Sequence, residues 1–540
     1  MNRKKQLVAV IGSAALVSAC GHSAASVRAA ASPVAQNGDI QWEVVDRFRL
    51  VKGEGSTEDL ARRFQFYYDE VSGQINNEGL PETYWDEANE RYEDEYLQVS
   101  SWKVRLNAGT TGKCQWKVAG SAPVEDECDG HVVEVKAPDT GVEVTRPDGS
   151  SATAVVSPRD ILIASLGDSY SSGEGVPDLR RYAGVLFWRW TDEKWIDRRC
   201  HRSLFSGPGL AALMYAKTNP HVSVTHLTFT CSGALLDSGL LAPYPGAEKR
   251  TPALPAQVEA LKSALTKANR VPEILTISAG GNDIGFADIV LAAATGSVKT
   301  VEETIEQRVE PGIASVVSNA SVLKRQLEKI GVRSPETTIL VTEYPNPTNL
   351  WRLPDTKDSS AAVEGKSPKT FKESCAPRKG VISFLPGAWG IGKVWQISAE
   401  ELERIEARVA TPLKTMSANL AQELGATLVT GVDEEFRHHG YCAPGLFPLD
   451  ESHRVRWINT VRDSFRMTGG LNGAMHPNIR GQDSIARHLL TAILNAECTS
   501  GRIAAGTALH SNLCTSDAWK SGLPGFDATQ RTPTGERFSE

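Results

Sequence analysis

Four residues stand where apolar, strand-like runs of the chain end or where a helical pattern begins. Ser169 follows the run at 161–166 within Gly-Asp-Ser, and Gly233 and Asn282 follow the next two runs. His476 lies far downstream in Met-His-Pro-Asn, just ahead of the last helical pattern. Because ligands of open α/β sheets bind beyond the carboxyl ends of the strands, we expect the first three residues at one sheet edge.

These residue types suit acyl transfer through a covalent intermediate. A serine in a glycine-flanked turn can approach a carbonyl carbon, and a histidine can serve as its general base. The N–H of Gly233 and the amide of Asn282 are suitable donors to an oxyanion, and losing one such donor typically lowers kcat ~10²–10³-fold. The sequence contains no Gly-x-Ser-x-Gly, which disfavours the nucleophile elbow of an α/β-hydrolase.

In this order, the four blocks resemble those of the SGNH hydrolases, also called GDSL esterases and lipases. The resemblance covers about residues 158–515 and rests on Gly-Asp-Ser at 167–169 with Gly173, on Gly-x-Asn-Asp at 280–283, and on His-Pro-Asn at 476–478. Within this family, the motif sequences are most similar to those of the actinobacterial-type secreted lipase branch. That similarity comes from the blocks at 169–175, 200–203 and 231–234.

The resemblance implies a flavodoxin-like three-layer α/β/α domain with a central parallel sheet, and neither a metal nor an organic cofactor. Ser169 would attack an ester carbonyl while His476 takes its proton. The N–H groups of Ser169 and Gly233 and the side chain of Asn282 would hold the oxyanion. The resemblance also supports a disulfide between Cys200 and Cys231.

One position departs from the family pattern. The family usually places an Asp three residues before its histidine, and this chain has Gly473 there. Some members orient the histidine with a backbone carbonyl, so we expect the carbonyl of Gly473 to do this. A remote acid, Asp463 or Asp433, is the alternative. If neither orients His476, the chain could be a weak enzyme or a degenerate binder.

The substrate class is an ester of a lipid, a short-chain alcohol or an acylated glycan, and we expect a monomer. Two other functions stay open: a non-catalytic surface glycan-binding protein on a hydrolase scaffold, and an O-acyltransferase that uses the same acyl-enzyme. The chain carries 58 Lys and Arg against 65 Asp and Glu, a net charge of -7. This balance argues against a nucleic-acid partner.

The N-terminus has the pattern of a bacterial lipoprotein signal. A basic start precedes the apolar stretch 7–17, and Val-Ser-Ala-Cys ends at Cys20. We expect cleavage after residue 19 and acylation of Cys20, which would anchor an exported protein to a membrane. By resemblance, Gly21 directs it to the outer membrane if the source is Gram-negative. An ordinary secretory peptide or a retained anchor is the alternative.

Eight of the nine cysteines remain after Cys20, and an even number in an exported chain indicates four disulfides. Eight cysteines allow 105 pairings, and we favour neighbours in sequence. The pairs are Cys114–Cys128, Cys200–Cys231, Cys375–Cys442 and Cys498–Cys514.

Period and composition divide the chain into five parts. We expect a signal peptide at 1–19, a flexible tether at 20–39, a β-rich domain with a helical insert at 40–157, the α/β domain at 158–515 and a polar tail at 516–540. Two-residue alternation predicts several short strands in the β-rich domain, which we expect to be small and β-sandwich-like. Short apolar runs predict parallel strands in the α/β domain, with helices between them. The runs lie at 161–166, 222–229, 274–277, 339–341 and 427–430, and the helical patterns near 203–218, 255–269, 312–330, 400–424 and 481–496.

Several further clusters carry weaker predictions. The stripe Trp85, Ala88, Tyr92 and Tyr96 has helical spacing and predicts a helix with a core face rather than a sugar platform. We expect His201, His226 and the pair His438 and His439 to be structural, because none has a set of metal-ligand partners. An apolar segment forms either a wall near Ser169 or a loop packed on its own domain, and both readings stay open. Its residues are Leu186, Phe187, Trp188, Trp190 and Trp195.

Overall fold

The computed structural model describes residues 40–69, 79–183, 190–295, 298–348, 399–441, 456–503 and 508–515. The predicted signal peptide, the tether, Cys20, the Cys375–Cys442 pair and the tail at 516–540 lie outside these residues. Within the described ranges, no helix is both long enough and apolar enough to cross a membrane.

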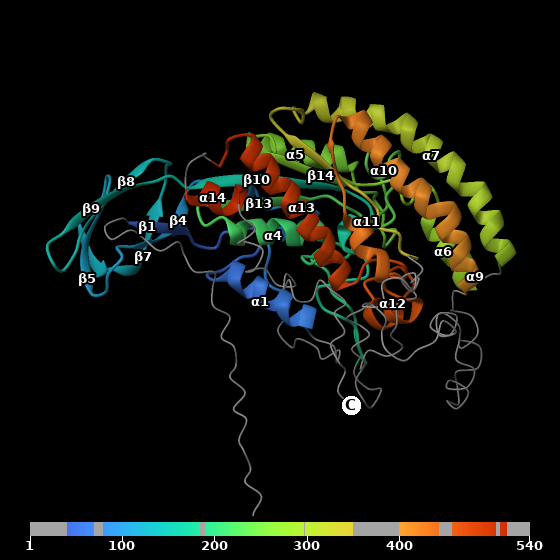
Figure 1. The fold of residues 1–540 in the computed structure, drawn as a ribbon, viewed down its shortest axis with the longest axis horizontal. Helices are drawn as coiled ribbons and strands as arrows, with labels where there is room; N and C mark the ends of the chain where they lie inside the picture. Colours follow the sequence, from blue (N-terminus) through green and yellow to red (C-terminus); the bar gives the residue numbers. More distant parts are fainter. Residues whose placement is uncertain are drawn as a thin grey trace, which may run out of the picture. The chain divides into compact units, whose positions relative to one another are not determined.

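A five-stranded parallel sheet forms the centre of the fold, in the order β13-β10-β14-β15-β16 (Figure 1). All four strand pairs are parallel, and β10, β13 and β14 are buried along almost their whole length. This confirms the prediction of an α/β fold, because apolar runs of this length suit strands covered on both faces. The bounds are β10 Arg159–Gly167, β13 Val222–Thr228, β14 Ile274–Ser278, β15 Thr338–Thr342 and β16 Thr427–Val429.

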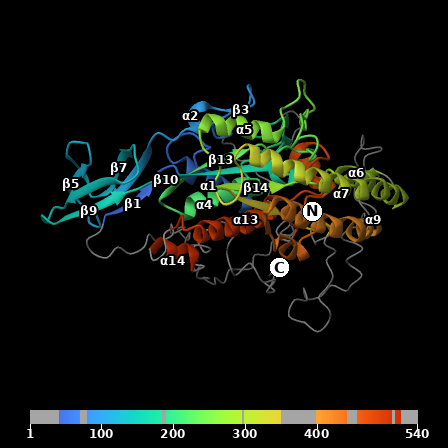
Figure 2. The same ribbon diagram turned by 90° about the horizontal axis from the view of Figure 1, so that it is seen from above.

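Helices cover both faces of this sheet (Figure 2). Helices α4 and α13 pack on each other and on one face, while α5 and α10 contact the other face and α7 packs against α10. The long helix α7 begins earlier than its period predicted and continues through Pro311. The helices of this part are α3 Ser169–Ser172, α4 Gly207–Thr218, α5 Gln257–Ala268, α6 Phe286–Thr295, α7 Val298–Lys329, α9 Ala399–Ile405, α10 Thr411–Leu424, α11 Val432–Glu435, α12 Val461–Thr468, α13 Ile479–Thr499 and α14 Ala508–Cys514, with the π-helical turn Glu406–Ala410 and the 3-10 turn Phe436–His438.

The β-rich part contains two small antiparallel sheets with their own core. One has the order β1-β4-β7 and the other β6-β5-β8-β9. Alternate residues of β5 are buried, among them Cys114 and Trp116, which is the pattern that the two-residue period predicted. The strands are β1 Gln41–Val44, β4 Trp102–Asn107, β5 Lys113–Val118, β6 Val124–Glu127, β7 Asp129–Val135, β8 Thr140–Thr145 and β9 Ser151–Val156. Two short hairpin pairs lie elsewhere, β2 Trp85–Asp86 with β3 Arg91–Tyr92 and β11 Tyr182–Ala183 with β12 Trp190–Thr191.

The prediction of a helix through Trp85, Ala88, Tyr92 and Tyr96 is wrong. Residues 85–92 form the hairpin of β2 and β3, and only α2, Asp94–Leu97, is helical. The Asp86 side chain accepts hydrogen bonds from the N–H groups of Ala88 and Asn89, at 3.1 Å each. Such a local Asx turn competes with the helix for the backbone donors. The predicted insert does contain a longer helix, α1, Ser56–Asp69.

The segment that contains α1, β2, β3 and α2 packs into the core of the α/β part, not into that of the β-rich sheets. It also covers β13, which is an edge strand of the central sheet. The hydroxyls of Tyr92 and Tyr96 each bond to the N–H and the C=O of one β13 residue, Thr228 and His226 respectively. At these two residues, side-chain hydroxyls rather than a further strand close the edge of the sheet.

Three of the predicted disulfides are present: Cys114–Cys128 in the β-rich part, Cys200–Cys231 beside the sheet, and Cys498–Cys514 at the end of α13. Each joins neighbours in sequence among the cysteines after Cys20, with separations of 14, 31 and 16 residues.

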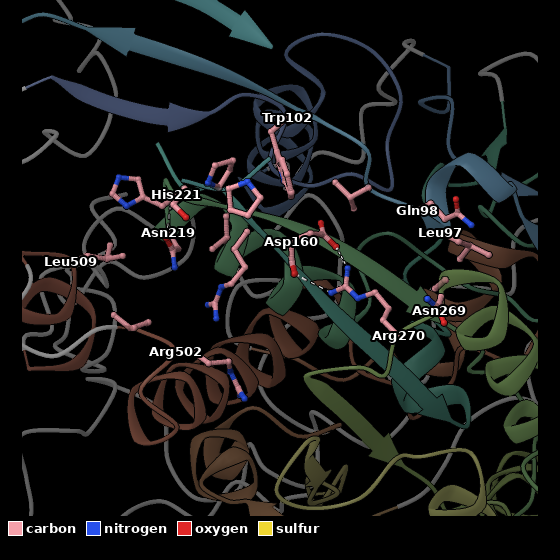
Figure 3. A pocket seen from close by; sticks show the side chains of 18 residues that line it. Leu97, Gln98, Trp102, Asp160, Asn219, His221, Asn269, Arg270, Arg502 and Leu509 are labelled. Atoms are coloured by element: carbon pink, nitrogen blue, oxygen red, sulfur yellow. Dashed lines mark hydrogen bonds and ion pairs between the residues drawn. The ribbon is translucent and has the colours of Figure 1, made fainter. Parts of the chain in front are cut away.

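A cavity of about 1050 Å³ opens where β10 and β13 begin (Figure 3). Trp102, Asp160, His221, Arg270 and Arg502 line it, and Arg270 is ion-paired with Asp160 at 2.8 Å. Because Ser169 follows the other end of β10, this cavity lies at the sheet edge opposite the predicted site.

Candidate active site

The turn after β10 places Ser169 at the carboxyl edge of the sheet. Gly167 has φ 140°, and a Cβ there would lie 2.0 Å from the carbonyl oxygen of Ser278, so only glycine fits. The carboxylate of Asp168 then accepts from the N–H of Tyr170 at 3.1 Å and caps α3. Ser169 is the first residue of α3, and its side chain is nearly buried.

His476 is held by a network of backbone contacts ahead of α13. The Asn459 N–H donates to the carbonyl of His476 at 2.8 Å, and the Met475 N–H donates to the carbonyl of Asn459 at 2.9 Å. The hydroxyl of Tyr170 donates to the carbonyl of Met475 at 2.8 Å. Met475 itself has φ 63°, a left-handed conformation that turns the chain sharply just before His476.

The structure brings Ser169 and His476 together, although 307 residues separate them: Ser169 Oγ lies 2.7 Å from His476 Nε2. The other ring nitrogen, Nδ1, lies 3.0 Å from the carbonyl oxygen of Ala474. Because a carbonyl can only accept, Nδ1 carries the proton and Nε2 is free to accept from the serine hydroxyl. This is the arrangement that a general base needs before attack.

The carbonyl that orients His476 therefore belongs to Ala474. The prediction from the sequence, which assigned this role to the carbonyl of Gly473, is wrong. The Gly473 carbonyl accepts instead from the backbone N–H of His476 at 3.2 Å. The left-handed Met475 reverses the chain and turns the neighbouring carbonyl toward the ring. Of the alternative acids, Asp463 caps α12 and pairs with Arg456 at 2.8 Å, while Asp433 accepts from the Asn346 N–H and pairs with Lys414.

Burial lowers the pKa of His476 below its usual value, and only part of this effect is offset by the negative charge of Glu174. The imidazole is therefore neutral, and able to accept a proton, through the whole range around neutral pH. Ser169 and His476 are 6% and 8% exposed, so little water surrounds the pair.

The oxyanion donors predicted from the sequence come from two further strand ends. Gly233 has φ 84°, and a Cβ there would lie 2.3 Å from the hydroxyl oxygen of Tyr244. Within the described residues, the N–H groups of Ser169 and Gly233 donate to no protein acceptor. The Asn282 side chain is fixed by a 3.1 Å hydrogen bond from Nδ2 to the carbonyl of Ala234.

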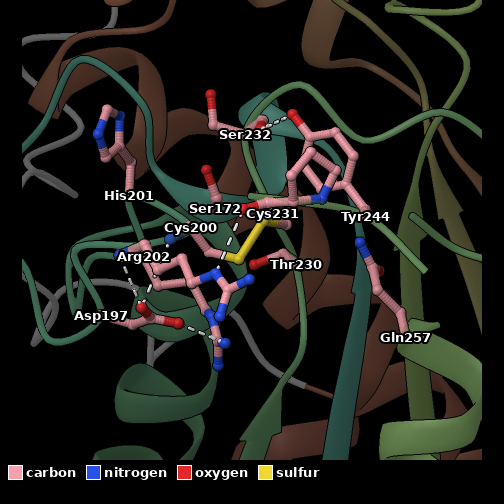
Figure 4. The surroundings of a disulfide bond; sticks show 12 residues. Ser172, Asp197, Cys200, His201, Arg202, Thr230, Cys231, Ser232, Tyr244 and Gln257 are labelled. Atoms are coloured by element: carbon pink, nitrogen blue, oxygen red, sulfur yellow. Dashed lines mark hydrogen bonds and ion pairs between the residues drawn. A yellow bond between two sulfur atoms is a disulfide. The ribbon is translucent and has the colours of Figure 1, made fainter. Parts of the chain in front are cut away.

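The Cys200–Cys231 disulfide holds the Gly233 turn in place (Figure 4). The N–H of Cys231 donates to the carbonyl of Gly167 at 3.0 Å, and the N–H of Ser232 donates to that of Cys200, also at 3.0 Å. On the outer side, the Tyr244 hydroxyl donates to the carbonyl of Ser232 at 3.0 Å. The turn is thus fixed to the nucleophile turn on one side and to the cysteine-bridged segment on the other.

Tyr344, at the end of β15, joins the nucleophile block to the Asn282 block and was not singled out from the sequence. Its hydroxyl donates to the Asp168 carboxylate and accepts from the Gly281 N–H at 3.2 Å. Burial raises the pKa of Asp168 to about 7, even though the Tyr344 hydrogen bond opposes this. Burial likewise raises the pKa of Asp283 to about 7. Both acids fix turn geometry through hydrogen bonds.

A second acid–histidine pair lies beside the site and was also missed. Glu174 Oε2 is 2.6 Å from His201 Nδ1, and Glu248 Oε1 is 3.3 Å from His201 Nε2. The Trp195 ring stacks on His201 with centroids 4.9 Å apart. The glycine-flanked carboxylate in the nucleophile block was the available signal, but its partner stands 27 residues further on.

Two further histidines from the sequence analysis, His226 and His439, have structural contacts. His226 is fully buried, its Nε2 is 3.0 Å from Ser165 Oγ, and burial lowers its pKa to about 4. The His439 ring stacks on Trp457. Leu186, Phe187 and Trp188 lie outside the described residues. Among the residues that the structure does describe, no group of three or more His, Cys, Asp or Glu could hold a metal ion.

Comparison with known proteins adds only distant likenesses. No family model matches the chain, and the curated proteins contain no match. Solved structures with a similar backbone fold include an extracellular lipase from Streptomyces rimosus. It is 20% identical, and the match covers 62% of this chain and 99% of the lipase, with a TM-score of 0.36. Phospholipase A1 from Streptomyces albidoflavus NA297 is 18% identical, and the match covers 62% of this chain and 98% of the phospholipase, with a TM-score of 0.35. A lipase from goat rumen metagenome has 13% identity, 62% and 97% coverage, and a TM-score of 0.28. At these values the likenesses carry no argument about activity.

Proposed function

We propose that this protein is a serine ester hydrolase of the SGNH type, in which Ser169 is the nucleophile and His476 the general base. The observation that carries the proposal is the 2.7 Å contact between Ser169 Oγ and His476 Nε2, at the edge where Gly233 and Asn282 also lie. The four blocks come from three strand ends and the loop before α13, which makes an accidental meeting of these residue types improbable.

In the proposed reaction, Ser169 Oγ forms a bond to the ester carbonyl carbon while its proton passes to His476 Nε2. The carbonyl electrons move to oxygen, where the N–H groups of Ser169 and Gly233 and the amide of Asn282 stabilise the charge. His476 then protonates the departing alkoxide as the carbon–oxygen bond breaks. Water, deprotonated by His476, attacks the acyl-enzyme and releases a carboxylic acid and free Ser169.

A single set of experiments tests this proposal. The chain, with Ser169→Ala and His476→Ala beside it, is incubated with a fluorophosphonate probe and with p-nitrophenyl esters from acetyl to palmitoyl. We expect labelling of the wild type only, and ester turnover that both variants lose by at least ~10³-fold. The optimal acyl length then separates a lipase from an esterase of short chains or acylated glycans. A folded wild type that remains unlabelled would refute the hydrolase and favour the glycan-binding alternative.

We further propose that the protein is exported and anchored through an acylated Cys20. The support is the basic start, the short apolar stretch and the small residues before Cys20. Metabolic labelling with an alkyne-modified palmitate tests this: we expect incorporation in the wild type and its loss in Cys20→Ser. Incorporation that persists in Cys20→Ser would contradict the assignment.

A further inference from the structure

Among the described residues, no acid bonds to the histidine of the proposed dyad, yet a buried carboxylate stands in the segment that packs against it. Glu174 stands between two glycines with φ 87° and 90°, in the segment directly after α3. Its N–H donates to the carbonyl of Ser169 at 3.1 Å. A Cβ on the next residue, Gly175, would lie 3.3 Å from the Cβ of His476. The backbone at 174–175 therefore lies against both the turn that carries Ser169 and the backbone end of the His476 side chain.

The side chain of Glu174 is wholly inaccessible to solvent. One oxygen, Oε2, contacts His201 Nδ1 at 2.6 Å, while the other, Oε1, is buried and has no described donor in hydrogen-bond geometry, although the nearby Ser232 hydroxyl helps to lower the pKa of Glu174. Burying an ionised carboxylate is unfavourable in free energy unless a paired charge or hydrogen bonds compensate for the lost hydration. His201 does so: burial would lower its pKa, but Glu174 and Glu248 raise it to about 9. Despite burial, His201 in turn lowers the pKa of Glu174.

The charge of Glu174 reaches His476. Among the charges that act on the pKa of His476, that of Glu174 raises it and that of His201 lowers it, the former being the stronger. Further out, Glu248 is 3.8 Å from Arg198 and 3.9 Å from Arg250, and the hydroxyl of Tyr244 faces Glu174 with its pKa raised by burial. A negative charge fixed beside His476 favours its imidazolium, which forms when Ser169 attacks.

We propose that Glu174, held as an anion by His201, is the positioning residue that replaces the missing triad acid and stabilises protonated His476 through space. The Ala474 carbonyl orients the ring and fixes its tautomer, while Glu174 supplies the negative charge that a carbonyl lacks. His201 keeps the carboxylate ionised and directs it away from hydrogen bonding to the ring. This inference rests on the proposed hydrolase, because it assigns a role in the same reaction.

The rate of fluorophosphonate labelling, measured from pH 4.5 to 9, tests the inference without knowledge of the substrate. Glu174→Gln keeps the shape and removes the charge. We expect the acid-side midpoint, which reports protonation of His476, to move down by about one pH unit, and the plateau rate to fall roughly tenfold. Glu174→Asp keeps the charge, so its midpoint should stay with the wild type even where its plateau rate is lower.

Glu497→Gln is the matched control. Glu497 is also fully buried and ion-paired, with Arg159 and Arg502, but it lies near the opposite edge of the sheet. We expect it to lower the thermal midpoint without moving the labelling profile. A folded Glu174→Gln with the wild-type midpoint would overturn the inference and leave the hydrolase standing. A folded wild type that never labels would instead remove the hydrolase, and the inference with it.

Discussion

A main-chain carbonyl orients His476, and two of the three proposed oxyanion donors are main-chain N–H groups. A side chain therefore affects these groups chiefly through the space that it occupies. Gly233 shows this most directly. Its positive φ and the Tyr244 hydroxyl, 2.3 Å from where a Cβ would stand, leave room for hydrogen only. Any larger residue must displace either the turn or Tyr244, and the N–H of residue 233, which we propose as an oxyanion donor, moves with the turn.

Gly233→Ala should therefore lower kcat by ~10²–10³-fold with little change in KM, as expected when a transition-state donor is misplaced. In the double variant with Tyr244→Phe, the nearest remaining atom lies 3.5 Å away, so we expect part of the loss to be recovered. Tyr244→Phe alone should stay within a few-fold of wild type. Ester turnover for the four proteins measures this, and equal kcat in both glycine variants would show that Tyr244 is not the obstacle.

The ion pair of His201 with Glu174 should make the stability of the protein depend on pH. Although burial lowers the pKa of His201, Glu174 and Glu248 raise it from 6.5 in the unfolded chain to about 9. The stabilisation is therefore complete below pH 6.5 and is lost as the pH rises through 9. Between pH 6.5 and 9.5, the Tm of the wild type should fall by at least about 2 °C more than that of His201→Gln. His221→Gln is the control, because burial lowers the pKa of His221, and its titration lies below this window. Parallel slopes in all three proteins would contradict the prediction.

Among the elements, the segment tied by Cys200–Cys231 holds the turn that contains Gly233, one of the proposed oxyanion donors, whereas the disulfide of the β-rich part lies within a separate core. Replacing Cys200 and Cys231 together by serine should cost about 2–4 kcal/mol of stability and also slow fluorophosphonate labelling at least tenfold well below the Tm. The matching change at Cys114 and Cys128 should lower stability alone. Calorimetry and labelling at 20 °C separate the two effects. Labelling that slows equally in both pairs would show that the Cys200–Cys231 bond has no particular role at the site.

The sequence predicts the elements best where burial is simple. Strands covered on both faces leave continuous apolar runs, so β10, β13 and β14 and the polar residues that follow them could be found. The hairpin at Trp85–Tyr92 was missed because aromatic spacing alone cannot show an Asx turn. The carbonyl of Ala474 was missed because the left-handed conformation of Met475 has no signature in a non-glycine residue. Glu174 with His201 depends on pairing between distant segments.

At the scale of the whole molecule, the N-terminal segments complete the central sheet. Beyond Tyr92 and Tyr96, the N–H of Val224 donates to the carbonyl of Arg47 at 2.7 Å, and the N–H of Arg49 donates back to Val224 at 3.0 Å. The outer edge of β13, which pairs with no other strand of the central sheet, is thus hydrogen-bonded at Val224, His226 and Thr228 to residues that precede the α/β part. Because buried backbone groups need partners, the α/β part depends on these segments for its own stability.

Replacing both Tyr92 and Tyr96 by phenylalanine keeps the aromatic packing and removes only the hydroxyls. The N–H groups of His226 and Thr228 and the carbonyl of His226 then lose their partners, while the Thr228 carbonyl keeps its hydrogen bond from Arg202. At ~1–3 kcal/mol for each unsatisfied group, the double variant should unfold at a Tm lower by roughly 5 °C or more. Tyr84→Phe is the control, since its ring stacks on Tyr96 and its hydroxyl bonds to no described residue. Hydrogen exchange should locate the effect: faster exchange at the amides of His226 and Thr228, with those of β15 unchanged. A double variant with the Tm of Tyr84→Phe would mean that water satisfies this edge, and that the α/β part is independent of the hydroxyls that cover it.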